Sequence, residues 1–205
     1  MLLYFSLLIC AASLGASLMG RASRDREARF FAFFRDPTKQ QVIAKYSFIV
    51  SIIGVFLLLI YASVRQYEVW SGNELAKLLL PPYNTTYFLT YIGFRFFAPY
   101  CISFIISLGF LKIATFYNKK YEERFFYPEE RYWGALALFL SGHPGWLLYL
   151  FVLLLSYMAF HFIVLLLKRG ADRLSLYYFW LPAGMFAILL QVWLAQFPWW
   201  QKLLV

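Results

Sequence analysis

The sequence predicts an all-helical bundle that crosses a lipid bilayer five or six times. Apolar runs long enough to span a bilayer recur along the chain, and the charged residues gather in the short connections between them. The chain is 62% hydrophobic and 14% charged, whereas an average soluble domain is about 45–50% apolar and about 25% charged. The remaining polar residues could not cover a water-soluble core, so lipid must surround much of the chain. We expect one integral membrane domain over residues 1–205, because no break in the sequence argues for two.

The first apolar run predicts a retained membrane anchor. No basic residue precedes it, and seven Lys or Arg lie between Arg21 and Lys45. A cleaved signal peptide has the opposite order, so we expect the N-terminus outside and loop 21–45 inside. The chain also lacks an Arg- and Ser-rich transit peptide, which favours a bacterial plasma membrane or a mitochondrial inner membrane. The predicted spans are about 2–20, 46–64, 95–117, 127–142, 146–167 and 176–197.

Three further patterns concern how the spans pack and where they end. Small residues recur every four positions at Ala12, Ala16 and Gly20, which predicts close helix packing. The aromatic segment 28–34 predicts a stretch that lies at the headgroup boundary. Trp199 and Trp200 follow the last run and predict interfacial anchors.

The third apolar run carries a charge and a proline. We expect a break or kink near Pro99, because proline removes a helix hydrogen bond, and an interfacial segment before it. Arg95 could bind an anionic substrate or face a carboxylate, or it could extend its guanidinium to the lipid headgroups. The connection before this run is predicted to lie outside, where Asn84 begins a glycosylation sequon. The sequence does not determine whether Asn84 is glycosylated.

The segment 141–145 reads Ser-Gly-His-Pro-Gly and interrupts another long apolar run. If residues 127–142 cross the bilayer and residues 146–167 return, the basic residues after the run lie inside, as the positive-inside rule favours. Sixteen helical residues reach about 24 Å, less than the hydrocarbon core of about 30 Å. A span this short must be buried among its neighbours. This pattern favours six crossings over five.

Few polar residues lie inside the runs, and four of them are candidate functional residues besides Arg95. Glu129 and Glu130 open the predicted short helix, where the helix dipole stabilises negative charge, so a structural role also explains them. His143 is expected to cap a helix or form a turn, and His161 to bond a neighbouring helix or lie near the interface. The sequence contains no hydrolase triad, zinc, phosphate-loop or dinucleotide motif.

No cofactor or metal site is predicted. The two histidines are the only ones in the chain and lie 18 residues apart, so they cannot form a facing pair at one depth. A haem held by this chain alone is therefore not expected, and the sequence leaves a haem or pigment shared with another chain open. The net charge of +9 lies in loops that face lipid headgroups, so nucleic acid is not an expected partner.

The order of features over residues 126–190 resembles the C-terminal part of prepilin peptidases, membrane aspartyl proteases with a Gly-x-Gly-Asp motif. Glu130 stands at the position of the motif Asp, Gly142 ends the short helix, and Pro182 matches a later proline. The resemblance implies a short helix, a long return helix and a basic loop.

The catalytic residues of that family are not present. Pro128 and Glu129 replace the motif glycines, and residues 65–70 contain no counterpart of the other catalytic Asp. A single carboxylate cannot divide the acid and base roles, so the resemblance implies a diverged, inactive relative.

The leading hypothesis is a non-catalytic structural or accessory subunit of a larger membrane complex, with lipids and other integral membrane subunits as partners. The alternatives are a diverged peptidase-like protein and a small transporter or channel subunit that uses Arg95.

Overall fold

The computed structural model describes residues 1–25, 37–121, 126–166 and 176–201, and every regular element within these ranges is a helix. The predicted helical bundle is therefore confirmed. The predicted headgroup segment 28–34 and the basic residues 168, 169 and 173 lie outside the described ranges. The elements are α1 (Leu2–Asp25), α3 (Pro37–Ser71), η2 (Ala76–Leu79), α4 (Thr85–Ile92), η3 (Gly93–Phe97), α5 (Ala98–Lys120), α6 (Glu130–Ser141), α7 (Gly145–Leu166), η4 (Leu176–Tyr178), α8 (Trp180–Leu194) and α9 (Pro198–Gln201).

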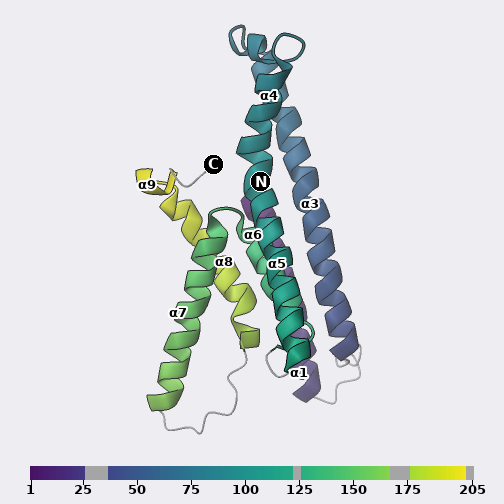
Figure 1. The fold of residues 1–205 in the computed structure, drawn as a ribbon, viewed down its shortest axis with the longest axis vertical. Helices are drawn as coiled ribbons and strands as arrows, with labels where there is room; N and C mark the ends of the chain where they lie inside the picture. The colour runs from purple at the N-terminus through teal and green to yellow at the C-terminus, as the bar shows by residue number, and fades with distance from the viewer. Residues whose placement is uncertain (26–36, 122–125, 167–175, 202–205) are drawn as a thin grey trace.

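Four helical segments are long and apolar enough to cross a membrane: Thr38–Ser71, Thr85–Lys120, Gly145–Leu166 and Leu176–Leu194. Helix α1 is also apolar over Leu2–Leu18, the part of it whose side chains the structure describes. These lengths support an integral membrane protein. We call the end of the bundle where α1 begins the Met1 end, and the end where α6 begins the Glu130 end (Figure 1).

Two neighbouring long helices each contain a charge-free stretch, and the two stretches lie at the same level of the bundle. Helix α3 carries no charge between Lys45 and Arg65, and the continuous helix α4–η3–α5 carries none between Arg95 and Lys112. The two helices run in opposite directions, so Arg65 and Arg95 lie toward the Met1 end (Figure 1). Because the charge-free lengths are about 28 Å and about 24 Å, they match a hydrocarbon core of about 30 Å. The remaining turns project past the Met1 end as a hairpin.

The expected break near Pro99 is a π-helical turn rather than an interruption. Residues Gly93–Phe97 form this turn, in which the Ala98 N–H bonds the Gly93 carbonyl. Proline has no N–H for the carbonyl four residues earlier, and its ring crowds that carbonyl, so the helix widens in the turn before it. The helix therefore continues from Thr85 to Lys120, and residues 85–92 extend it outward instead of forming a separate interfacial segment.

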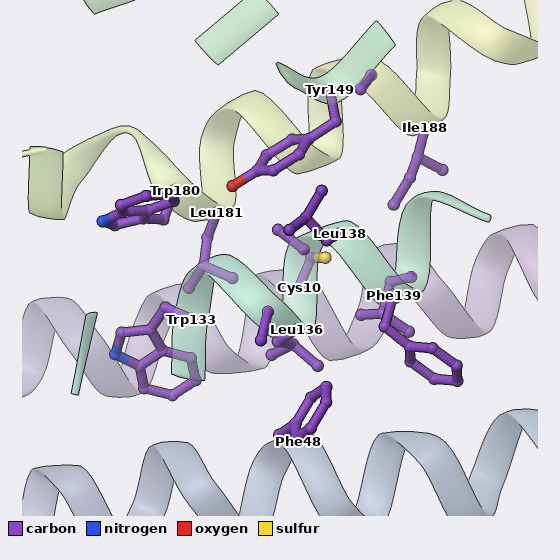
Figure 2. Close-up of a cluster of buried hydrophobic side chains, with 14 of the residues drawn as sticks. Cys10, Phe48, Trp133, Leu136, Leu138, Phe139, Tyr149, Trp180, Leu181 and Ile188 are labelled. Atoms are coloured by element: carbon purple, nitrogen blue, oxygen red, sulfur yellow. The ribbon is translucent and has the colours of Figure 1, made fainter. Parts of the chain in front are cut away.

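Helix α6 forms the centre of the bundle. It has 12 residues and contacts α5, α8, α3, α7 and α1, and every residue from Trp133 to Ser141 is buried. Figure 2 shows its side chains surrounded by those of the other helices. Gly134 allows this close approach, because a Cβ there would lie 2.8 Å from the rings of Phe110 and Trp180. The short element expected over 127–142 is thus a helix buried among its neighbours.

Helix α1 packs inside this chain through a face other than its predicted small-residue stripe. The buried positions are Ser6, Cys10, Ser13 and Ser17, which recur on one side of the helix. Serine suits this face because its hydroxyl can bond its own backbone, as Ser17 does to the Leu14 carbonyl at 2.8 Å.

The stripe itself lines an open groove between α1 and α3. Ala12 is exposed and Ala16 is half-buried, and both contribute to the groove wall. The role of Ala12, Ala16 and Gly20 in close helix packing stays a prediction.

Candidate functional site

The two candidate carboxylates lie where α6 begins, at the Glu130 end. Glu129 and Glu130 are each 1% exposed, and each residue interacts with other parts of the chain. Glu129 precedes the helix and Glu130 is its first residue, so the positive end of the helix dipole favours their negative charge. They are consecutive residues of one segment, so the short helix alone does not provide two facing carboxylates.

The chain segment that leads into α6 is fixed by one buried side chain. The Asn118 amide donates to the Phe126 carbonyl at 2.9 Å, and its oxygen accepts from the Phe126 N–H at 3.1 Å. Arg131 then donates through Nε to the Pro128 carbonyl at 3.1 Å. These contacts join the end of α5 to the start of α6 and hold the two glutamates in place.

Two tryptophans lie beside this entry with their indole N–H groups unpaired. Trp133 of α6 and Trp180 of α8 are each 2% exposed, and no residue in the described part of the chain accepts a hydrogen bond from either Nε1. Figure 2 shows both indole nitrogens directed toward the beginnings of α6 and α8. Trp133 also borders a small enclosed space with Ser17, Gln40 and Tyr177, and this space is too small for a water molecule. The Glu130 end thus combines buried carboxylates with two indole donors.

The candidate residue His143 lies in a turn, and its role stays a prediction. It lies between α6 and α7, where its N–H donates to the Pro99 carbonyl at 3.2 Å and its Nδ1 accepts from Trp146 Nε1 at 3.1 Å. The first contact ties the turn to the beginning of α5. Both contacts favour a structural role for His143.

His161 lies near the other end of α7, with its ring stacked on Tyr157 at 6.2 Å. Its Nδ1 is buried, and none of the described residues forms a hydrogen bond with it. The two histidines thus lie toward opposite ends of α7 and do not face each other. Among the described residues, no three His, Cys, Asp or Glu side chains are grouped as metal ligands would be.

Arg95 lies on the surface, not inside the bundle. It is exposed and borders a shallow groove of about 260 Å³ with Tyr87, Thr90, Tyr91 and Phe94. All of these residues belong to α4 and η3, and the transport role of Arg95 stays a prediction.

The remaining predicted residues lie at the Met1 end. Trp199 is 54% exposed and Trp200 is 6% exposed, and their rings meet edge to face. Their interfacial role stays a prediction. Asn84 caps α4, because its Oδ1 accepts from the Tyr87 N–H at 3.0 Å.

Sequence reasoning missed two polar side chains that join helices. Besides Asn118, Gln191 of α8 donates to the Ser141 carbonyl at the end of α6, at 2.9 Å. Gln191 is a polar residue within an apolar run, and such a residue usually bonds another helix. That signal could have identified it. Nothing in the spacing of the sequence could have identified its partner.

Comparisons with protein-family models, curated proteins and solved structures find no match to this chain.

Proposed function

We propose that this chain is a non-catalytic integral membrane subunit that packs against other transmembrane chains. The observation that carries the proposal is the position of α6. This helix fills the centre of the bundle, where a membrane transporter or intramembrane enzyme would hold its substrate.

The packing around α6 leaves little room. A Cβ at Gly184 of α8 would lie 2.9 Å from the Ala137 Cβ of α6. A Cβ at Gly145 would meet the Gln191 amide, which already bonds the end of α6. The grooves that border described residues of α1, α3 and α4 open on the outside of the bundle. These features support a scaffold rather than a pathway.

The exposed surface of helix α7 favours a partner chain on the outside of the bundle. Its buried residues are Gly145, Tyr149 and Leu153, which form one narrow stripe near its first half. The second half has large exposed side chains, such as Met158 and Phe162. In the same half lies His161, whose buried Nδ1 has no hydrogen-bond partner within residues 1–25, 37–121, 126–166 and 176–201. A polar group at membrane depth costs free energy unless it is paired, so a helix of another chain is a suitable source of its hydrogen bond.

The test is extraction in a mild detergent followed by native mass measurement. We expect a complex of fixed stoichiometry, and a photo-crosslinking residue placed at Met158 or Phe162 should form an adduct with a protein of defined mass. The same residue placed at Leu89, which is 62% exposed on the projecting hairpin, is the control. A lone monomer that forms only lipid adducts at all three positions would refute the proposal.

A diverged peptidase-like protein is the second candidate. The observation that favours it is the order of a short buried helix that begins at Glu130, a turn at Gly142 and the long returning helix α7. If Glu130 supports cleavage of a membrane-inserted leader, Glu130→Gln should abolish processing while Glu129→Gln reduces it less. Unchanged processing in Glu130→Gln would refute the peptidase-like hypothesis.

A further inference from the structure

The exposed face of α4 and η3 carries an isolated cation beside aromatic rings. Counted from Tyr87, the residues Thr90, Tyr91, Phe94 and Arg95 lie three, four, seven and eight positions further along the chain, so they share one side of the helix. The Arg95 guanidinium has no ion pair or hydrogen bond among the described residues. By contrast, Arg65 on the neighbouring helix pairs with Glu68 at 2.5 Å.

The depth of Arg95 matches that of the lipid headgroups. Its neighbour Phe96 lines a groove together with Met1 and Arg65, so all three lie at the level where the charge-free part of the bundle ends. Side chains on a helix lean toward its N-terminus, and here that direction leads out of the hydrocarbon core. The guanidinium is thus directed toward the headgroup phosphates, past Tyr91.

The aromatic rings of the groove are held from behind. Trp70 at the end of α3 lies 4.8 Å from the Tyr91 ring and 6.2 Å from the Tyr87 ring, both centroid to centroid. The π-helical turn adds to this arrangement, because the exposed groove ends within it and the helix then continues into the bundle. The groove is therefore preorganised.

We propose that this groove binds an anionic phospholipid in the leaflet at the Met1 end. The Arg95 guanidinium would bind the phosphate through two parallel hydrogen bonds, a geometry that suits arginine better than lysine. The hydroxyl groups of Tyr87, Thr90 and Tyr91 would face the polar part of the headgroup. The acyl chains would continue along the exposed face of α5, where Cys101 and Ile105 are exposed.

The test compares lipid binding to the full chain and to two charge-removing variants in detergent. The probes are phosphatidylglycerol, phosphatidylcholine and soluble glycerophosphate, and bound lipid is counted by native mass spectrometry. Arg95→Gln should weaken phosphatidylglycerol binding by about tenfold, the loss expected for one charge-assisted contact. The matched control Arg65→Gln removes the same charge at the same depth and should change binding by less than about twofold. Arg95→Lys should give an intermediate affinity.

Three outcomes would overturn the proposal. Equal binding of phosphatidylglycerol and phosphatidylcholine would indicate a general lipid contact. Equal losses in the two glutamine variants would indicate a diffuse charge effect. Competition by glycerophosphate at the concentration of the lipid would indicate a site for a soluble anion.

Discussion

At the scale of single residues, this bundle is joined by polar side chains that bond the backbone of another segment. Gln191 bonds the Ser141 carbonyl, Tyr177 donates to the Ser17 carbonyl at 3.0 Å, and Asn118 bonds both backbone groups of Phe126. The Ser141 carbonyl lies at the end of α6 and Phe126 lies in a connection, where no helix can satisfy the backbone groups, whereas Tyr177 adds a second hydrogen bond to a carbonyl within α1. The polar residues within the apolar runs thus contribute to the assembly of the helices.

Gly142 is the residue whose backbone conformation decides the turn between α6 and α7. Its φ is 65° and its ψ is 175°, a region that is essentially restricted to glycine. We expect Gly142→Ala to lower the free energy of unfolding by about 1–3 kcal/mol. The measurement is denaturant titration of the purified protein in detergent. The control is Gly109→Ala on α5, where a Cβ would meet no atom within 4 Å. Equal stability of the two variants would contradict this account.

At the scale of elements, the short helix α6 depends on close approach by its neighbours. Its 12 residues span about 18 Å, so lipid could not surround it without exposing backbone at its ends. The surrounding helices instead cover it along its length, and small residues such as Gly134, Ala137 and Gly184 let them do so. Helix α6 is therefore stabilised by contacts with its neighbours rather than by its own length.

A double-mutant cycle at Ala137 and Gly184 tests that packing. Gly184→Ala adds a methyl group 2.9 Å from the Ala137 Cβ, so we expect a loss of about 1–3 kcal/mol in the free energy of unfolding. Ala137→Gly removes the opposing methyl group and should reduce the cost of the added one. The free energy of unfolding lost in the double variant should be smaller than the sum of the two single losses by about 0.5 kcal/mol or more. Strictly additive losses would show that α6 and α8 are not in direct contact.

At the scale of the whole molecule, the direction of each helix predicts the sides of the membrane. Helices α6 and α7 run in opposite directions, and α9 lies at the same end of the bundle as the start of α1 (Figure 1). The six crossings that the sequence favours stay a prediction, and they would place both ends of the chain on one side. Five crossings would place them on opposite sides.

Cysteine labelling distinguishes these two topologies. In a chain with Cys101→Ser, an impermeant maleimide should label Asn73→Cys and Gln196→Cys from the same side of intact vesicles. It should label Lys120→Cys from the other side. These three positions are exposed, and the native Cys10 is buried. Labelling of Gln196→Cys together with Lys120→Cys would favour five crossings instead.

Several features of the fold could be predicted because they depend on local chemistry. The apolar runs predicted the long helices, the Gly and Pro residues at 142–145 predicted the break before α7, and the length of the preceding run predicted a short buried span. The break expected at Pro99 was a π-helical turn, because a local widening is enough to accommodate a proline when the rest of the helix is supported. The small-residue spacing on α1 did not identify its buried face, because serines can also be buried when they bond their own helix.

The candidate site was less accessible to sequence reasoning. The sequence identified Arg95 as a candidate functional residue. It did not indicate that the rings of its groove pack against Trp70, which lies about 20 residues away on another helix. The buried indole groups of Trp133 and Trp180 gave no signal, since tryptophan in an apolar run is ordinary. The contacts between helices decide which polar groups lie close together. These contacts join residues that are far apart in the chain, so local sequence patterns do not predict them.

The sequence by itself determined that this protein is built from apolar helices with charged connections, because the cost of placing charge in lipid acts on each segment independently. Only the tertiary structure decided that α6 lies at the centre and that Arg95 faces outward beside a preorganised aromatic groove. The physical reason is that helix faces become inner or outer only when neighbouring helices cover them.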